Sequence, residues 1–192
     1  ILHIVFYYLA LPCLAQITVT SPIQQYGLES INNVAAISAN GARFATATVR
    51  GMAYFWDAQT GARLASVKAS NGYIETMALS PDGSKALTVR SSDSEGRLWD
   101  TLTGQLNRTF SNPNQGINAA VLPDGSGILL GAIENHVSVG KILDVQTGER
   151  LKTFGEFGWH AVISPDGSKI ACPGNTTSVW DAETGARIRS FT

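Results

Sequence analysis

The sequence predicts an all-β fold, a β-propeller of about four four-stranded blades in an incomplete ring, because three short signals recur along it at a nearly constant spacing. The first signal is a turn ending in glycine, and successive glycines lie 42 residues apart, at Gly41, Gly83, Gly125 and Gly167. The second is a pair found as Trp56-Asp57, Trp99-Asp100 and Trp180-Asp181 and, in the third copy, as Leu143-Asp144. The third is Thr-Gly, at 60–61, 103–104, 147–148 and 184–185. A period of about 40–45 residues is typical of one propeller blade with four strands.

The second copy shows how four strands fit into one period. Its apolar and β-branched residues predict strands at 74–79, 85–90, 97–101 and 106–110. The first two strands are joined by Pro81-Asp82-Gly83. Proline presets φ, aspartate bonds to the local backbone and glycine accepts a positive φ, so we expect a tight turn there.

The residue pattern also indicates how the strands are covered. Residues 44–49 and 128–130 lack a clean alternation of apolar and polar side chains. This pattern is expected where neighbouring sheets cover both faces of a strand, as in a propeller. The outer segments, such as 187–191, carry more charge and are predicted to be the fourth strand of each blade.

The repeated aspartates and tryptophans have a structural explanation. Aspartate recurs at Asp82, Asp124 and Asp166 before the turn glycines, and at Asp57, Asp100, Asp144 and Asp181 before Thr-Gly. Their fixed places favour a role in shaping turns over a ring of reactive carboxylates. The tryptophans Trp56, Trp99 and Trp180 lie in register on predicted third strands, so we expect them to pack between blades.

The first 15 residues resemble a secretory signal peptide without its beginning. Residues 1–11 are apolar apart from His3, and small residues precede a cleavage position after Ala15. The run is too short for a membrane span, which needs ~20 apolar residues. We therefore expect an extracytoplasmic or secreted protein; a strand of a preceding blade and a cytoplasmic location are the alternatives. Residues 16–33 would be a linker or an extra strand and residues 34–192 the blades, with the remaining blades in sequence missing from this chain.

Charge and motifs exclude several classes of function. The 14 basic and 15 acidic residues are scattered without runs, which argues against a nucleic-acid partner. The sequence contains no His-Glu-x-x-His, Gly-x-Ser-x-Gly or phosphate-loop motif and no paired cysteines at metal spacing. We therefore expect no catalytic residue, no cofactor and no metal. His136 and His160 fall in different copies, and Cys172 is predicted to be a small core residue.

The repeats resemble one known family. Ser-Pro-Asp-Gly at 80–83 and Arg-Leu-Trp-Asp at 97–100, with their equivalents in the other copies, are similar to the WD-repeat (Trp-Asp repeat) β-propeller family over about residues 33–192. The resemblance implies a rigid toroid that binds proteins or peptides on a loop face, usually without catalysis. Every copy lacks the family's Gly-His, and Asp93 alone occupies the place of the family's buried aspartate. The chain therefore resembles a divergent, bacterial-type exported propeller, whose blades depend on apolar packing.

The loops differ in how much they vary between copies. The Pro-Asp-Gly and Asp-x-x-Thr-Gly turns share one predicted face and are nearly uniform, whereas the loops of the other face vary. Variable loops on a fixed frame are common binding sites, and arginine and aromatic residues dominate binding hot spots. The candidate partner-binding residues are Arg50, Tyr73, Arg90, Asp93, Phe157 and Trp159. For Phe157 and Trp159 the alternative is that they pack under their own loop as local core.

These features predict a non-catalytic scaffold that binds a protein or peptide partner. Two other functions stay open. One is a regulatory or substrate-binding domain of a larger enzyme. The other is a propeller enzyme with a quinone cofactor, since such propellers share the Asp-x-x-Thr-Gly turn.

Overall fold

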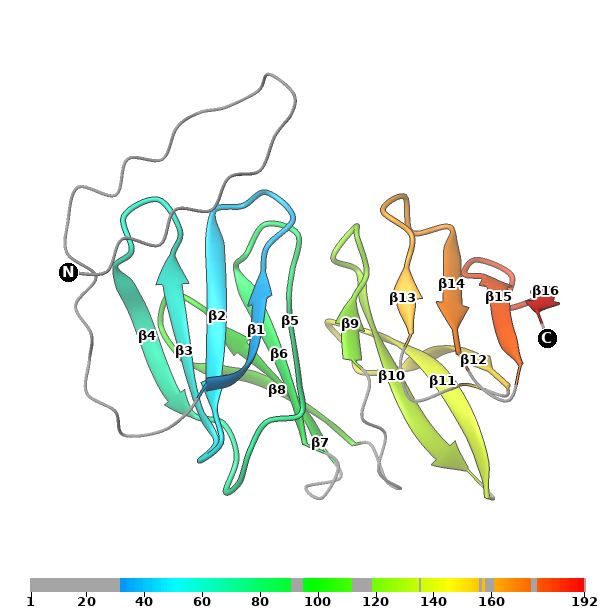
Figure 1. Ribbon diagram of the computed structural model, residues 1–192, viewed down its shortest axis with the longest axis horizontal. Coiled ribbons are helices and arrows are strands. Elements are labelled where there is room, and N and C mark those ends of the chain that lie inside the picture. Colours follow the sequence, from blue (N-terminus) through cyan, green and yellow to red (C-terminus); the bar gives the residue numbers. More distant parts are fainter. Residues whose placement is uncertain are drawn as a thin grey trace, which may run out of the picture.

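A computed structural model shows four four-stranded antiparallel sheets and no helix in the residues that it describes (Figure 1). The described residues are 32–90, 95–111, 119–134, 136–155, 157, 161–173 and 176–191. Each sheet corresponds to one sequence repeat, and the four sheets are called blades 1 to 4. The predicted all-β class and the four-stranded repeat are confirmed.

The four strands of each blade follow one another in chain order. Blade 1 contains β1 (Asn32–Ile37), β2 (Arg43–Thr48), β3 (Met52–Asp57) and β4 (Arg63–Lys68). Blade 2 contains β5 (Thr76–Leu79), β6 (Lys85–Arg90), β7 (Glu95–Asp100) and β8 (Leu106–Ser111). Blade 3 contains β9 (Ala119–Val121), β10 (Gly127–Glu134), β11 (Val137–Asp144) and β12 (Arg150–Phe154). Blade 4 contains β13 (Val162–Ile163), β14 (Lys169–Cys172), β15 (Thr177–Asp181) and β16 (Arg187–Phe191).

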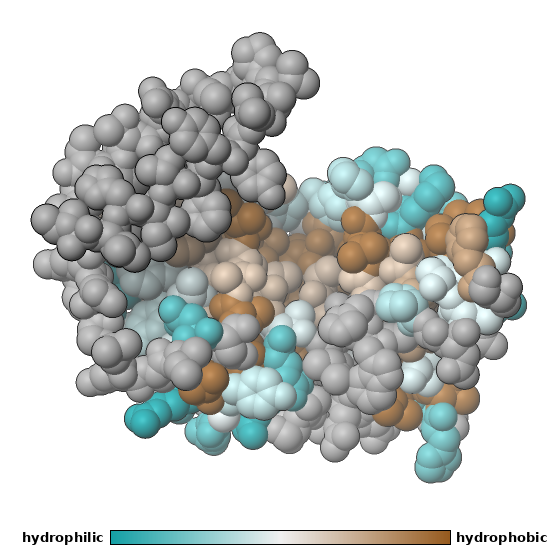
Figure 2. Space-filling model, in the orientation of Figure 1, coloured by the Kyte–Doolittle hydropathy of each residue, from teal (hydrophilic) through white to brown (hydrophobic). Residues whose placement is uncertain are grey.

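The blades lie side by side, and the ring is not closed (Figure 1). The first strands are neighbours, because β1 contacts β5 and β5 contacts β9. Blades 1 and 4 occupy the two ends of the row (Figure 1). Figure 2 shows hydrophobic residues in the middle of this face and hydrophilic ones towards its right-hand edge. Ile37 of β1 and Val162 of β13 are each 67% exposed, so the first strands carry apolar side chains on their open side.

Apolar packing joins each blade to the next. Three clusters of buried side chains lie between the blades: Ala45 and Phe55 with Ala86 and Trp99, Leu87 and Leu98 with Ile128 and Leu143, and Leu129 and Phe154 with Ile170 and Trp180. In each cluster the Trp of the pair, or the Leu that replaces it, packs against the preceding blade. The expected role of the tryptophans between blades is therefore observed for Trp99 and Trp180.

One polar link accompanies each of the three tryptophans in the described residues. The indole N–H of Trp99 donates to Thr88 Oγ1 at 2.9 Å, and that of Trp56 donates to Thr46 Oγ1 at 3.2 Å. In blade 4 the acceptor is the Sγ of Cys172, at 3.2 Å from Trp180 Nε1. Each acceptor lies on the neighbouring second strand. Blades 1, 2 and 4 thus retain a tryptophan-to-second-strand hydrogen bond where the sequence suggested apolar packing alone.

Residues 1–31 lie outside the described part of the chain. The signal peptide expected at 1–15 and the linker or extra strand expected at 16–33 therefore stay predictions, as does export. Blade 1 begins at Asn32, two residues before the predicted start. None of the residues described forms a helix long and apolar enough to cross a membrane.

Candidate binding surfaces

The connections between strands emerge at two opposite ends of the blades. The β1–β2 and β3–β4 turns lie at the upper end of blade 1 in Figure 1, and the β2–β3 and β4–β5 loops lie at the lower end. We call the first end the turn face, because it carries the Gly and Thr-Gly turns of every blade. The second end is called the loop face. In blade 1, whose connections all lie within the described residues, the predicted separation of uniform turns from variable loops is therefore observed.

The glycine turns of the turn face hold their own aspartates. In blade 2, Asp82 Oδ1 accepts hydrogen bonds from Ser80 Oγ at 2.6 Å and from the Ser84 N–H at 2.9 Å. These bonds, with that of Ser80 as the largest cause, lower the pKa of Asp82. The turn closes when the Gly83 N–H donates to the Ser80 carbonyl, and Gly83 has a φ of 75°. A positive φ explains why this position is glycine.

The Thr-Gly turns use their aspartates in the same way. Asp100 Oδ1 accepts from the Leu102 and Thr103 N–H groups, while Asp100 Oδ2 pairs with Lys85 Nζ at 2.9 Å. The hydrogen bond from Lys85 is the largest cause that lowers the pKa of Asp100 far below its usual range. The equivalent bonds recur at Asp57, Asp144 and Asp181. The repeated aspartates therefore shape turns, as the sequence predicted.

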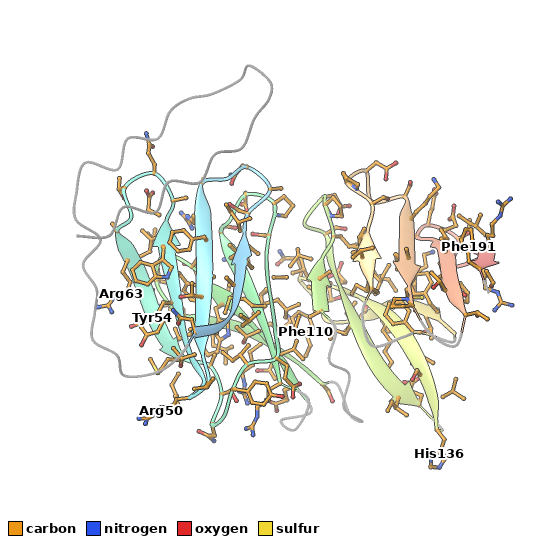
Figure 3. All side chains as sticks on the ribbon, viewed as in Figure 1. Arg50, Tyr54, Arg63, Phe110, His136 and Phe191 are labelled. Carbon is orange, nitrogen blue, oxygen red and sulfur yellow. The ribbon has the colours of Figure 1, made fainter. Side chains whose placement is uncertain are left out.

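The structure brings three of the predicted partner-binding residues to one rim on the loop face. Arg50 precedes Gly51, whose carbonyl oxygen accepts from the Ala69 and Ser70 N–H groups. A side chain built on Gly72 would meet the guanidinium of Arg90 at 2.6 Å, so Arg90 packs against this loop. Tyr73 follows in the same loop and is 49% exposed. Tyr73 thus lies in the loop between β4 and β5, and Arg50 and Arg90 lie beside this loop. Figure 3 shows Arg50 at this end of blade 1.

Charged neighbours act on the Tyr73 hydroxyl. The negative charge of Glu75 and a hydrogen bond to it raise the pKa of Tyr73, while the positive charge of Arg90 opposes this shift. Tyr73 therefore keeps its proton at neutral pH and can act as a hydrogen-bond donor.

The remaining predicted rim residues are not part of this group. Phe157 is only 2% exposed and belongs to the core between blades 3 and 4, so its assignment as a surface residue is wrong and the local-core alternative holds. Its ring contacts that of Phe154 at 6.4 Å and occupies the space over Gly140, where a Cβ atom would lie 2.4 Å from it. Asp93 and Trp159 lie outside the described residues. His136 stands at the exposed tip of the β10–β11 hairpin (Figure 3).

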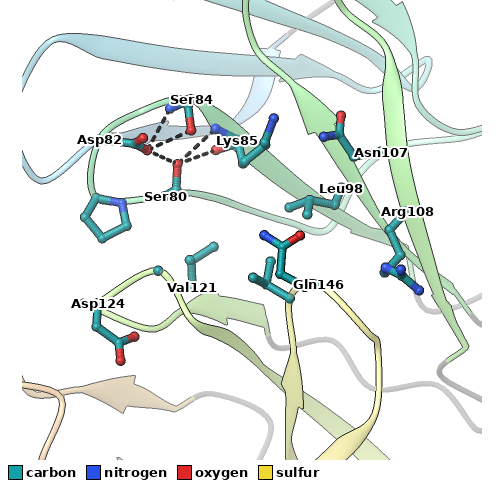
Figure 4. A pocket seen from close by; sticks show the side chains of 13 residues that line it. Ser80, Asp82, Ser84, Lys85, Leu98, Asn107, Arg108, Val121, Asp124 and Gln146 are labelled. Atoms are coloured by element: carbon teal, nitrogen blue, oxygen red, sulfur yellow. Dashed lines mark hydrogen bonds between the residues drawn. The ribbon is translucent and has the colours of Figure 1, made fainter.

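The structure also contains a cleft that the sequence did not indicate. It opens on the turn face between blades 2 and 3 and has a volume of about 610 Å³ (Figure 4). Its lining combines the blade 2 residues 80–82, 84, 85, 98, 107 and 108 with the blade 3 residues 121, 124, 125, 145 and 146. Volumes between about 300 and 1,000 Å³ are typical of ligand sites. The cleft is therefore a second candidate binding surface.

A metal centre finds no support in the described ranges. No group of three or more His, Cys, Asp or Glu side chains there is placed to hold a metal ion. Cys172 is fully buried, and its sulfur accepts the indole hydrogen bond described above.

Comparisons with known proteins agree with the fold. No protein-family model matches the sequence. Among curated proteins, the chain is similar to WD repeat-containing protein 1 of Gallus gallus and of Bos taurus, with 34% and 32% identity over 82 residues. The match covers 41% of this chain and 13% of each of those proteins.

Two solved structures extend the likeness to most of the chain. The Cps50 (Swd1) β-propeller domain of Myceliophteria thermophila has a TM-score of 0.69 at 14% identity, over 85% of this chain and 58% of that chain. Hydrazine synthase of Kuenenia stuttgartiensis has a TM-score of 0.68 at 16% identity, over 89% of this chain and 52% of that chain. At these identities both show the fold alone. Together with the repeat residues and the curated relatives, they support a divergent WD-repeat type of β-propeller.

Proposed function

We propose that this WD-repeat scaffold binds a protein or peptide partner through its loop face and has no catalytic activity of its own. The observation that carries the proposal is the placement of Tyr73. Its side chain is half-exposed, while the next residue, Ile74, is fully buried in the core of blades 1 and 2. The loop therefore holds Tyr73 at the surface on a fixed support.

A fixed support matters because binding costs less entropy when the contacting side chain is already ordered. The loop is held by backbone hydrogen bonds to Gly51 and by Arg97 of blade 2, whose Nη1 donates to the Ala69 carbonyl oxygen. Arg50 and Arg90 add positive charge around Tyr73. An ordered tyrosine beside two arginines has the composition of a binding hot spot.

The test compares variants of the two faces. The variant Arg50→Ala/Tyr73→Ala removes two of the three rim side chains. The variant Arg50→Ala/Arg90→Ala/Trp159→Ala removes both rim arginines and the tryptophan that the sequence predicts for the same face. Gln59→Ala/Glu183→Ala is the matched control, because both residues are exposed in Thr-Gly turns of the turn face. Each immobilised chain captures proteins from a native lysate, and captured proteins are quantified by mass spectrometry.

We expect both rim variants to lose the proteins that the unaltered chain and the control retain. Thermal unfolding followed by circular dichroism must show that all chains stay folded. Equal capture by folded rim variants and control would refute the placement on the loop face.

No observation favours the cofactor alternative. It depended on the Asp-x-x-Thr-Gly turns and on possible export. Each of the turn aspartates accepts hydrogen bonds from its own turn. A role as a binding domain within a larger enzyme would use the same loop face, so the capture experiment applies to it as well.

A further inference from the structure

At each interface between neighbouring blades, one residue from each blade occupies an equivalent position on the turn face. The identity of these two residues determines whether the interface leaves a cleft. Between blades 1 and 2, Arg43 crosses the interface and donates from Nη1 to Thr101 Oγ1 at 2.5 Å and to the Gly83 carbonyl at 3.4 Å. Thr101 is fully buried and donates to the same carbonyl at 2.7 Å. In addition, the Asn40 N–H donates to the Pro81 carbonyl at 3.1 Å. This interface is closed by polar side chains.

The interface between blades 3 and 4 is closed in another way. Gly127 occupies the position of Arg43 there, and Leu122 replaces the serine with which the other three turns begin. Leu122 packs against the same cluster as Ala182, which occupies the position of Thr101. Apolar packing therefore fills the space that Arg43 fills at the first interface.

Neither arrangement is present between blades 2 and 3. Lys85 occupies the position of Arg43, but its ammonium group pairs with Asp100 of its own blade at 2.9 Å. Val145 occupies the position of Thr101 and offers no hydroxyl group for a bridge. The cleft of about 610 Å³ is what remains when both contacts are missing.

The cleft lining has an apolar part and two free amides. Leu98, Val121 and Val145 form the apolar part. Asn107 of β8 and Gln146 of the β11–β12 turn lie on facing walls (Figure 4). Both are exposed, and neither side-chain amide has a hydrogen bond to another of the residues described. An amide offers donors and an acceptor together, which suits a peptide main chain.

The end of the cleft away from Arg108 carries two acidic residues. Asp82 and Asp124 lie at that end, and the Asp124 carboxylate points away from that of Asp82 (Figure 4). Hydrogen bonds from their own turns lower the pKa of each, so both are ionised at neutral pH. Neither forms an ion pair with another described side chain. A cationic side chain of a ligand at this end would find the carboxylate of Asp82, since Lys85 of the same wall is already paired with Asp100.

We propose that this cleft binds an extended peptide segment of a partner protein, which places an aliphatic side chain against Leu98, Val121 and Val145 and a lysine or arginine beside Asp82. The peptide main chain hydrogen-bonds to Asn107 and Gln146. No aromatic side chain lines the cleft, so nucleobases and sugar rings lack a stacking surface there. The site is on the opposite face from the rim and does not depend on it.

The test uses three pools of fluorescein-labelled octapeptides with two fixed positions separated by one variable residue, because only alternate side chains of an extended peptide face the same side. The fixed pairs are leucine–lysine, leucine–glutamate and serine–lysine. Binding to the full chain is followed by fluorescence anisotropy. We expect the leucine–lysine pool to bind about tenfold more tightly than the other two, since one lost charge pair or one lost buried aliphatic group is worth about that factor. Asn107→Ala/Gln146→Ala should weaken this binding by about tenfold.

Two controls locate the site. Gln59→Ala removes the amide at the position of Gln146 in blade 1 and should leave binding unchanged. Arg50→Ala/Tyr73→Ala alters only the rim and should also leave it unchanged, which separates this proposal from the proposed function. Equal binding of all three pools, no binding of any pool, or undiminished binding by Asn107→Ala/Gln146→Ala would overturn the proposal.

Discussion

Replacing Thr101 with valine tests how the turn face joins blades 1 and 2. Valine has nearly the shape of threonine, so the change removes a hydroxyl group and leaves the packing volume almost unaltered. The change removes the hydrogen bond that Thr101 accepts from Arg43 at 2.5 Å and the one that its single hydroxyl proton donates to the Gly83 carbonyl at 2.7 Å, with the Ser84 carbonyl as a second acceptor at 3.2 Å. Because Thr101 is fully buried, water cannot replace the hydroxyl at that point.

The magnitude follows from the two bonds. A neutral hydrogen bond contributes about 0.5–1.5 kcal/mol and one to a charged group about 1.5–3 kcal/mol. Arg43 is only partly buried and keeps its contact with the Gly83 carbonyl, so the loss of its hydrogen bond to Thr101 costs less than the full value for a charged group. We therefore expect Thr101→Val to lower the free energy of unfolding by about 2–3 kcal/mol.

The matched control is the reverse exchange in the next blade. Val145→Thr places a hydroxyl group at the same position, beside the open cleft, where water can reach it. Its effect should stay below about 1 kcal/mol. Urea unfolding followed by tryptophan fluorescence measures both variants, with an unchanged m-value as the sign that the unfolded state is the same.

A double-mutant cycle with Arg43→Met completes the test. Coupling of at least about 1 kcal/mol between Arg43 and Thr101 is expected for residues that share a bond. If Thr101→Val costs less than about 0.5 kcal/mol, or if Val145→Thr costs as much, the account of how these interfaces close is refuted.

Three further predictions concern the loop face, the core and the turns. Gly51→Ala should lower the free energy of unfolding, measured in urea, by about 3 kcal/mol or more, because Gly51 has a φ of 80° and a Cβ atom would lie 2.1 Å from the Ser70 carbonyl oxygen. Gly155→Ala is the control, because Gly155 has open space around it, and should lower it by less than about 0.5 kcal/mol. Phe157→Ala should lower the free energy of unfolding by about 3–5 kcal/mol, because the ring is part of the core. A change near zero would show that the ring is a surface side chain. The pKa of Asp166 is lowered from 3.8 to about 2, mainly by the Ser164 hydrogen bond, so its contribution to stability is complete above about pH 4 and is lost as the pH falls towards 2. Urea midpoints across that range should therefore fall less steeply for Asp166→Asn, and equal slopes would contradict the prediction.

The fold could be predicted from the sequence because the signals that define it are local. A turn with a positive φ requires glycine or a near equivalent within a few residues, and Gly41, Gly83, Gly125 and Gly167 have φ values of 69° to 75°. Once four such turns are fixed at a constant period, the strands between them have little freedom of position. The predicted second strand, 85–90, coincides with β6. The predicted first strand, 74–79, begins two residues before β5, because Ile74 is buried as part of the preceding loop rather than in the sheet.

The loop face could be predicted from topology, but the direction of a single side chain could not. Arg50, Tyr73 and Arg90 share a rim because alternate connections of a meander emerge at the same end. Phe157 follows the same rule for its backbone, yet its ring turns inward over Gly140. Gly140 lies inside β11, and a glycine within a strand is a signal for such a close approach.

The cleft could not be predicted because it arises from differences between repeats that look nearly identical. The turns look uniform because all of them share their glycine, and three of the four glycine turns share an aspartate before it. What distinguishes them are the positions after each motif: arginine, lysine or glycine at 43, 85 and 127, and threonine, valine or alanine at 101, 145 and 182. Each interface needs one residue from each of two blades to close, so neither set is informative alone. A repeat protein can therefore keep its scaffold unchanged and open a site at one interface by two substitutions, which is the arrangement between blades 2 and 3.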